Sequence, residues 1–582
     1  MPYNRLVGQT GGLLNVRKFI PLLVVATGLL AYRNSFTNSF IFDDVPTIPG
    51  NSSIHHLWPV WPALTPPHKG GTTVEGRPIV SLSFAINYAI NGSRVWGYHA
   101  VNLAIHICAA LVLLGITRRT LVQPPLRQRF GQAAEPLALV IAIIWVVHPL
   151  QTESVTYVVQ RCESMMGLFY LLTLYWVIRG AESGWPNIWY ISSVASCLLG
   201  MASKEVMVSA PLIVLLYDRT FLGGSFTEAW RRRWRLYLAL AATWIPLAYL
   251  VITTGTRGGT AGIGAGMAWP AYALTQFQAI PHYLRLCFWP QPLVFDYGTG
   301  LAGDVGDVLP GALIVTVLLI GTAVALRRWP SVGFLGAWFF AILAPTSSVV
   351  PVASQTIAEH RLYLPLAAVI AAAVLGAFAL GKRLLNHQQG VALASMAGAT
   401  VVILFSWLTI QRNRDYHSSF SIWQDTVDKC PDNPRAHDNL GIALREQGRL
   451  PEAIDQYEQA LRLRPDDAQT RYNLGIALLP LGRTQEAIEL WEQALQIKPD
   501  LAEAHYNLGN AMFQTGKVPE AIHHYEQALL IKPDLAEAHY NLAVVLEQAG
   551  QLQQAIQHYQ QALQITPDYL KARSALARIQ AR

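Results

Sequence analysis

From Pro431 onward, the chain repeats itself every 34 residues. A proline, an asparagine, a small residue, an alanine and an aromatic residue each recur at this interval: Pro431, Pro465, Pro499, Pro533 and Pro567; Asn439, Asn473, Asn507 and Asn541; Gly441, Gly475, Gly509 and Ala543; Ala453, Ala487, Ala521 and Ala555; Tyr457, Trp491, Tyr525 and Tyr559. A period of this length indicates a stack of similar helix pairs, each packing only against its neighbours. Small residues let two helices approach closely, the aromatic residue fills the gap to the next unit, and proline ends the second helix.

This pattern resembles the tetratricopeptide repeat. We expect four full repeats over residues 434–567, a capping helix over 568–582, and a linker with a degenerate half-repeat over 411–433, in which Trp423 takes the aromatic position. The resemblance implies a superhelix whose first helices line a concave face. It places candidate residues for binding a protein partner on that face: Asn439, Asn473, Asn507, Asn541, Tyr472, Tyr506 and Tyr540. Packing between units explains the same residues equally well.

Residues 1–410 have a different character, with long apolar runs separated by short polar loops. The chain is 52% hydrophobic and only 14% charged, which is typical of an integral membrane protein. We expect about eleven membrane spans of helix. Their centres are Leu23, Leu111, Ile143, Leu171, Ser196, Ile213, Ala242, Val317, Trp338, Ala371 and Leu404. The expected fold is therefore all-α, a multi-span membrane bundle followed by an α-solenoid.

Lys and Arg predict the orientation of this bundle. They flank the apolar runs in loops that share one side, as at Arg118-Arg119, Arg231-Arg232-Arg233 and Lys382-Arg383. The positive-inside rule makes that side cytoplasmic. The repeats and the unusual polar loops then lie on the other side, in the periplasm or a lumen. The distribution of the formal net charge of +7 indicates this orientation, and no nucleic-acid partner is expected.

Two polar loops carry charge beside apolar runs, where charge is costly. One holds Phe42-Asp43-Asp44, and the other runs from Glu359 through His360 and Arg361 to Pro365. Paired acids could act as a base or bind a cation, and a guanidinium can hold a phosphate through two hydrogen bonds. Together they indicate a membrane enzyme with a lipid-phosphate donor. The alternatives are a turn or helix cap for the acids and an interfacial anchor for Arg361.

The ordered polar motifs resemble those of the lipid-dependent glycosyltransferases of the GT-C fold, most closely the transmembrane-and-tetratricopeptide protein O-mannosyltransferases and their bacterial relatives. The matching stretches are Phe42-Asp43-Asp44, Gly76 to Phe84, Gly97 to Leu103, His148 to Glu153, Lys204-Glu205, and Ala344 to Pro365. The resemblance implies inverting transfer of a sugar, mannose-like, from a polyprenyl phosphate to Ser or Thr hydroxyls of a protein, outside the cytoplasm. It implies a bacterial inner membrane, or the membrane of the endoplasmic reticulum in a eukaryote.

Under this resemblance, Asp43 or Asp44 is the base, with a slight preference for Asp44. Arg361 holds the donor phosphate, supported by Glu359 and His360. Glu153 orients the acceptor or stiffens the first loop, and Arg161 pairs with Glu153 or holds phosphate. Lys204 neutralises phosphate, and Arg77 holds the first loop in place. Each also has a purely structural explanation, such as a self-paired turn for Lys204-Glu205.

A divalent cation is possible, because the two acids and His55, His56, His99 and His106 offer ligands. Two further functions remain open. A membrane-anchored scaffold would leave all binding to the repeats, although an anchor needs no Asp-Asp or Glu-His-Arg. A lipid-sugar transporter would place ionisable residues within its spans, whereas here they gather in loops.

Overall fold

The computed structural model describes residues 13–65, 73–255, 269–298, 300, 305–346 and 355–581. In these ranges every regular element is a helix, which confirms the predicted all-α fold class. The chain divides into two compact units, Met1–Lys429 and Cys430–Arg582, called here the membrane unit and the repeat unit.

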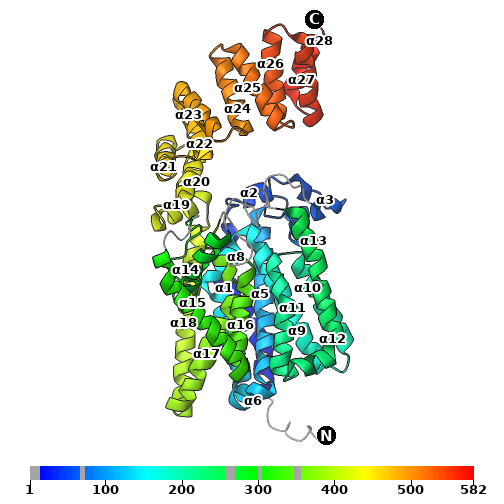
Figure 1. The fold of residues 1–582 in the computed structure, drawn as a ribbon, viewed down its shortest axis with the longest axis vertical. Helices are drawn as coiled ribbons and strands as arrows, with labels where there is room; N and C mark the ends of the chain where they lie inside the picture. The colour runs from blue at the N-terminus through cyan, green and yellow to red at the C-terminus, as the bar shows by residue number, and fades with distance from the viewer. Residues whose placement is uncertain are drawn as a thin grey trace. The chain divides into compact units, whose positions relative to one another are not determined.

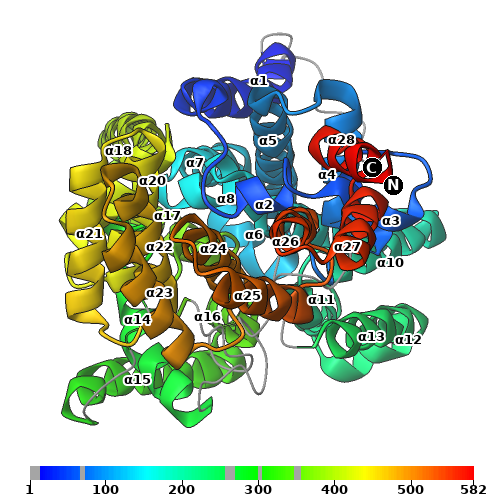
Figure 2. The same ribbon diagram turned by 90° about the horizontal axis from the view of Figure 1, so that it is seen from above.

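The membrane unit is a bundle of long helices joined by loops and short helical turns (Figures 1 and 2). Its main helices are α1 (Leu13–Ala31), α4 (Pro78–Asn91), α5 (Val95–Leu121), α7 (Ala134–Val147), α9 (Arg161–Glu182), α10 (Pro186–Met201), α11 (Ala210–Tyr217), α12 (Phe226–Ala242), α13 (Trp244–Thr254), α14 (Trp269–Phe288), α15 (Val305–Arg328), α16 (Pro330–Ala344), α17 (Pro365–Leu384), α18 (His387–Asp415) and α19 (Ser419–Lys429). The short elements that matter below are α2 (Asp44–Thr47), α3 (Trp61–Leu64), α6 (Pro124–Phe130), α8 (Thr152–Thr156) and the turns Val158–Gln160 and Glu359–Leu362.

Seven helical segments of the described residues are long and apolar enough to cross a membrane. They are Val95–Leu121, Pro124–Val147, Val158–Glu182, Phe226–Thr254, Gly306–Arg328, Pro365–Leu384 and Gln388–Asp415, and Phe19–Ala31 and Pro330–Ala344 are shorter apolar helices. Each predicted span centre lies within a helix. The helices α10 and α11, which hold the centres Ser196 and Ile213, are only 16 and 8 residues long. The number of spans therefore stays a prediction.

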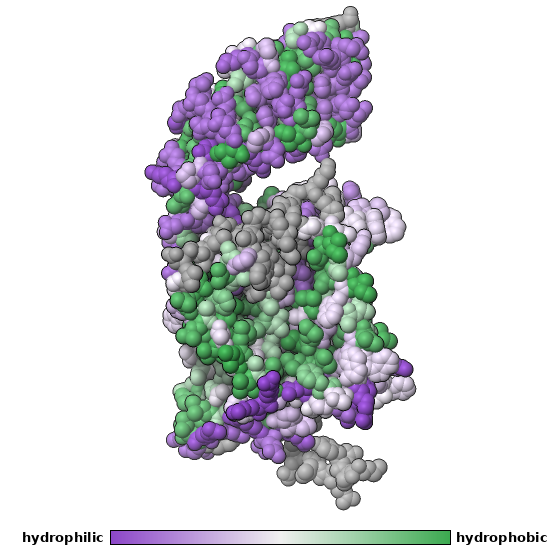
Figure 3. Space-filling view, in the orientation of Figure 1, coloured by the Kyte–Doolittle hydropathy of each residue, from purple (hydrophilic) through white to green (hydrophobic). Residues whose placement is uncertain are grey.

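The two ends of the bundle differ in charge. Basic residues occupy the last turns of α5, α6 and α17. These turns lie at the opposite end of the membrane unit from α2, α3 and α8 (Figure 1). Hydrophobic side chains cover the helices between, and hydrophilic ones gather around α6 (Figure 3). The structure thus separates a basic end from an end built of polar loops.

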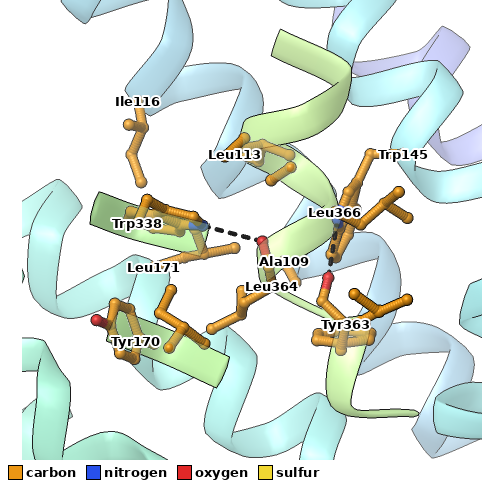
Figure 4. Close-up of a cluster of buried hydrophobic side chains, with 14 of the residues drawn as sticks. Ala109, Leu113, Ile116, Trp145, Tyr170, Leu171, Trp338, Tyr363, Leu364 and Leu366 are labelled. Carbon is orange, nitrogen blue, oxygen red and sulfur yellow. Dashed lines mark hydrogen bonds between the residues drawn. The ribbon is translucent and has the colours of Figure 1, made fainter. Parts of the chain in front are cut away.

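Two buried tryptophans fix the chain where α17 begins. The indole N–H of Trp145 on α7 donates to the carbonyl of Tyr363 (3.1 Å), and that of Trp338 on α16 donates to Leu364 (2.9 Å; Figure 4). A buried indole N–H needs such a partner. Both bonds fall within three residues of Arg361, so the apolar core directly supports the Glu-His-Arg turn.

The repeat unit is built from helix pairs: α20 (Pro434–Glu446) with α21 (Leu450–Leu463), α22 (Ala468–Leu478) with α23 (Thr484–Ile497), α24 (Ala502–Gln514) with α25 (Val518–Ile531), and α26 (Ala536–Gln548) with α27 (Leu552–Ile565), followed by α28 (Leu570–Gln580). Gly475 shows why the small position recurs. A Cβ there would lie 2.4 Å from the Trp491 ring, so the glycine lets the paired helices pack closely. This confirms the predicted solenoid of repeats.

The helix α19, which precedes the first pair, belongs to the membrane unit by its contacts. The predicted linker of residues 411–433 thus contains the last turn of α18, all of α19 and the four residues before α20.

Candidate active site at the loop end of the membrane unit

The adjacent acids of the first loop have different surroundings. Asp44 is 1% exposed. Its Oδ1 accepts the backbone N–H of Val159 (2.8 Å), and its Oδ2 accepts that of Ile41 (3.1 Å). Burial raises the pKa of Asp44 to about 8, opposed by these two hydrogen bonds. With both oxygens engaged, the Asp44 carboxyl joins the first loop to the turn before α9.

Asp43 is half-buried, and its backbone N–H donates to the Tyr157 hydroxyl (3.1 Å). The residue before it, Phe42, has φ 45°, a left-handed conformation that is strained for a bulky side chain. The Phe42 ring contacts Trp423 edge to face, with ring centroids 5.1 Å apart, and lies 6.2 Å from Phe295. Asp43 is therefore the less buried of the two acids, on a strained segment that aromatic contacts support.

Glu153 and His360 form a buried pair. The Glu153 Oε1 lies 2.7 Å from His360 Nδ1, and the Glu153 Oε2 accepts the backbone N–H of His360 (2.9 Å). Burial raises the pKa of Glu153 to about 7 and holds the pKa of His360 well below its usual range. Burial thus disfavours the charged form of each partner.

Arg361 is 5% exposed, and its guanidinium is fixed by neutral acceptors. It donates to the Tyr272 hydroxyl (3.1 Å) and to the carbonyls of Thr356 (3.0 Å) and Gln355 (2.5 Å). No carboxylate of the described residues forms an ion pair with it, and its described hydrogen-bond partners are all neutral. The anchoring contacts hold it more firmly than an interfacial side chain would be held.

Glu359 is 1% exposed and bridges to a segment that the sequence motifs did not include. Its Oε1 accepts the N–H of Val294 (2.6 Å) and the hydroxyl of Tyr297 (2.8 Å). Its Oε2 is buried without a hydrogen-bond partner among the described residues. Burial raises the pKa of Glu359 to about 7, which the charge of Arg412 opposes.

Lys204 and Arg77 are held by two buried ion pairs. The Lys204 ammonium contacts Glu163 on α9, and the Arg77 guanidinium lies 3.6 Å from Glu205. Arg77 also donates to the carbonyl of Thr73 (3.0 Å). Lys204 therefore does not pair with its neighbour Glu205, and Arg77 ties the start of α4 to the Lys204-Glu205 segment. The charges of Lys204 and Arg361 both act on the Glu153–His360 pair.

Arg161 does not pair with Glu153, contrary to one of the two roles expected for it. It is 0% exposed, and its donors go to neutral groups on α4 and α5. Its Nε donates to the Asn102 amide oxygen (2.6 Å), and its Nη2 donates to the Asn87 amide oxygen (2.8 Å) and the Tyr98 carbonyl (3.1 Å). The remaining Nη1 donates to Ser83. All three guanidinium nitrogens of Arg161 therefore donate hydrogen bonds that hold α9 against α4 and α5.

The structure thus brings Glu153, Glu359, His360, Arg361 and Lys204 into one buried charged network. It joins the Asp43-Asp44 loop to this network through residues 157–159. Sequence reasoning missed Tyr157, Phe295, Tyr297 and Arg412. The signal that could have found Phe295 and Tyr297 is the run Leu293 to Gly298, in which Asp296 stands between these two aromatic residues.

The described residues contain no group of three or more His, Cys, Asp or Glu side chains placed to hold a metal ion. His99 contacts the carbonyl of Asn38, His106 contacts Tyr363 and the carbonyl of Val146, and His55 stacks on Tyr88. These three histidines are therefore engaged in contacts within the chain.

In the repeat unit, the predicted asparagines make hydrogen bonds within the chain. Asn507 donates to the Tyr472 hydroxyl and Asn541 to the Tyr506 hydroxyl, both at 3.1 Å. Asn473 donates to Asp438 (3.0 Å), and Asn439 donates to the carbonyl of Arg435 (2.8 Å). This ladder links successive repeats. Beside it lies a cavity of about 390 Å³, lined by Asn507, Asn510, Phe513, Tyr525, Asn541 and Val544 among others.

A second cavity, of about 650 Å³, lies in the membrane unit toward its basic end. It is lined mainly by apolar side chains of α5, α16 and α17, with Arg129 and Arg328 among its polar residues. It contains none of the acids or basic residues of the charged network. Its lining suits hydrocarbon, such as a lipid chain, better than a sugar.

Comparison with known proteins supports both units. Tetratricopeptide-repeat family models match residues 412–468, 439–502 and 500–568. The chain is 24% identical over 482 residues to a protein O-mannosyl-transferase of Caenorhabditis elegans, covering 78% of this chain and 64% of that protein. It is 24% identical over 555 residues to the protein O-mannosyl-transferase TMTC1 of Mus musculus, covering 76% of this chain and 58% of that protein. The predicted resemblance to the transmembrane-and-tetratricopeptide protein O-mannosyltransferases is confirmed, and the chain spans less than two thirds of the length of these relatives.

Among solved structures, the crystal structure of MamA is similar to part of the chain, with 24% identity and a TM-score of 0.24. The match covers 26% of this chain and 89% of MamA. A crystal structure of YrrB, described as a TPR protein with an unusual peptide-binding site, matches with 22% identity and a TM-score of 0.24, over 27% of this chain and 80% of YrrB.

Proposed function

We propose that this chain, a relative of the protein O-mannosyl-transferases over about three quarters of its length, is a membrane glycosyltransferase. It moves a mannose-like sugar from a polyprenyl phosphate to Ser or Thr hydroxyls of a protein acceptor. The observation that carries the proposal is the loop end of the membrane unit. There, the less buried of two adjacent acids stands on a strained, supported segment, joined to a buried network that contains Arg361 and Lys204.

Asp43 is the proposed base. The acceptor oxygen attacks the anomeric carbon while the bond from that carbon to the phosphate oxygen breaks. The hydroxyl proton passes to the Asp43 carboxylate, and the polyprenyl phosphate leaves with the bonding electron pair. One displacement inverts the configuration at the sugar. Asp44, the residue slightly preferred from sequence, is the weaker choice because both of its oxygens accept backbone N–H groups.

Arg361 is the proposed partner of the leaving phosphate. Its guanidinium is fixed by carbonyls and a hydroxyl and has no described carboxylate partner. A fixed positive group that faces charge developed during bond cleavage lowers the barrier without reorganising. Lys204 adds positive potential nearby. The Glu153–His360 pair fixes the backbone of the turn that carries Arg361.

The loop end is proposed to face the periplasm or a lumen, because basic residues gather at the other end. The repeat unit is proposed to bind the protein acceptor. The cavity beside the asparagine ladder combines amide groups with the apolar side chains of Phe513 and Val544, a lining that suits an extended peptide.

The test is sugar transfer from a defined polyprenyl-phosphate sugar to an acceptor protein in membranes. Asp43→Asn should abolish transfer while leaving the protein folded, and Arg361→Ala should also abolish transfer. Asp44→Asn should instead lower stability by about 1–3 kcal/mol, because an amide nitrogen faces a backbone N–H that had an acceptor. Asp455→Asn, on an exposed position of α21, is the matched control.

A loss of transfer in Asp44→Asn without a loss of stability, together with full activity in Asp43→Asn, would reverse the assignment of the base. The competing function is a membrane-anchored scaffold. It predicts that no donor supports transfer by the wild type and that partner proteins are retained equally by all four variants.

A further inference from the structure

The helix α19 is part of the loop cluster of the membrane unit. Its Trp423 is 2% exposed, in the midst of aromatic rings from two loops. The ring centroids of Trp423 and Phe42 are 5.1 Å apart, and those of Trp423 and Phe295 are 5.2 Å apart, both edge to face. Such edge-to-face contacts add to the stabilisation that comes from burying the rings. Trp423 thus packs on the residue that directly precedes Asp43.

Polar contacts fix α19 at both of its ends. Before the helix, the carbonyl of His417 accepts the backbone N–H (3.2 Å) and the hydroxyl (2.9 Å) of Ser39 in the first loop. At its end, the Lys429 ammonium donates to the carbonyl of Leu293 (2.9 Å), just before Phe295. In its middle, Asp425 pairs with Arg412 on α18 at 2.7 Å. The position of Trp423 is therefore determined by the membrane unit itself.

The conformation of Phe42 requires such support. A non-glycine residue in the left-handed region is strained and persists only where its surroundings impose that conformation. The rings of Trp423 and Phe295 are the aromatic neighbours of Phe42. Without Trp423, the Phe42 ring would lose a buried contact and the backbone could relax to an ordinary φ. That change would redirect the next residue, Asp43.

We propose that Trp423 is a positioning residue: α19 holds Phe42 in its left-handed conformation and so aims the Asp43 carboxylate at the acceptor. The proposal rests on the proposed function for its kinetic consequence, but its structural consequence does not.

The experiment combines hydrogen exchange of residues 38–47 with the transfer assay. The variants are Trp423→Ala, Trp423→Phe and Phe42→Gly, with Trp407→Ala, a 54% exposed tryptophan on α18, as the matched control. Trp423→Ala should speed exchange in residues 38–47 and leave α5 and α9 protected. It should lower kcat roughly 10- to 100-fold with little change in donor KM, since about 1 Å of misplacement costs about 100-fold.

Trp423→Phe should restore most of both properties, because a phenyl ring still meets Phe42. Phe42→Gly should reproduce the kcat loss with α19 unchanged, since it removes the ring on which Trp423 acts.

Unchanged exchange in residues 38–47 of Trp423→Ala would overturn the positioning role. So would a donor KM that rises as kcat stays constant. If the wild type transfers no sugar, the proposed function fails, and the exchange data alone decide whether α19 fixes the first loop.

Discussion

Arg161 is the most completely engaged basic residue of the candidate site, and its partners are all neutral. The Nε and both terminal nitrogens donate to acceptors on α4 and α5. Its guanidinium also lies over the Phe84 ring, 4.5 Å from the centroid. A buried cation held in this way supports packing, and its removal leaves several acceptors unpaired.

We therefore expect Arg161→Lys to destabilise the membrane unit by about 3–5 kcal/mol, because a single ammonium cannot reach acceptors arranged for a planar fork. The measurement is the thermal unfolding midpoint in detergent, beside the yield of folded protein. Arg127→Lys, on the exposed face of α6, is the control. A variant that keeps its midpoint but binds the donor poorly would instead assign Arg161 to the phosphate.

The Glu153–His360 pair predicts a specific pH dependence of stability. The pKa of Glu153 is raised to about 7, so its contribution is full below about pH 4 and is lost as pH rises through 7. The pKa of His360 is lowered, so its contribution has the opposite sign and grows as pH rises to about 6.5. In the wild type the two contributions partly cancel.

Glu153→Gln removes the carboxyl while its amide can still accept the His360 N–H. Between pH 5 and 6.5, in the range set by the ordinary His pKa of about 6.5, this variant should gain stability more steeply than the wild type. Unfolding midpoints across this range measure the slope. Glu135→Gln, in the first turn of α7, should follow the wild type. Parallel curves for Glu153→Gln and the wild type would contradict the assigned shifts.

The cost of placing charge beside hydrocarbon determines which site residues could be predicted from the sequence. That cost singles out Asp43, Asp44, Glu153 and Arg361, because none could be buried without a partner. It cannot choose between the adjacent acids. The choice depends on backbone amides of Ile41 and Val159, and the second lies 115 residues along the chain from Asp44. The hydrogen-bond partners of Arg161 likewise include amide side chains that are distant in sequence, Asn87 and Asn102.

At the scale of the element, the repeats make a sharp prediction about packing. A Cβ at Gly475 would clash with the Trp491 ring. In the fourth repeat, the two corresponding positions hold Ala543 and Tyr559. Gly475→Ala should therefore cost about 1–3 kcal/mol through overpacking. Gly509→Ala, where a Cβ would lie 2.8 Å from the smaller Tyr525 ring, should cost less.

Chemical unfolding of the repeat unit, which has its own core, measures both variants. Gly482→Ala is a useful comparison, since its φ of +74° penalises alanine through the backbone rather than through packing. An equal cost for Gly475→Ala and Gly509→Ala would show that the helix pairs separate to admit the methyl group.

The element α19 shows where periodicity stops being informative. The 34-residue repeat predicts the helix pairs because each packs on near neighbours in sequence. Trp423 occupies an aromatic position of the same period, and a repeat model matches from residue 412. Yet its ring packs on Phe42 and Phe295, far away along the chain. A period reports spacing and cannot report which surface a side chain meets.

For the whole molecule, the proposed chemistry depends on orientation, because a lipid-borne sugar donor and a secreted acceptor must meet on one side of the membrane. Single cysteines at three exposed positions report that orientation: Ser52 in the first loop, Gln128 on α6 and Gln514 on α24. In intact cells, a membrane-impermeant maleimide should label Ser52→Cys and Gln514→Cys and should label Gln128→Cys only after lysis. The unsubstituted chain, with its own five cysteines, sets the background.

The physical reason for this expectation is that basic loops resist translocation, and the last turns of α5, α6 and α17 are basic. Labelling of Gln128→Cys alone in intact cells would place the charged network in the cytoplasm and exclude transfer to secreted proteins there. Labelling of Ser52→Cys without Gln514→Cys would keep the donor site outside but place the repeats across the membrane from it. The repeats would then have to bind something other than the acceptor.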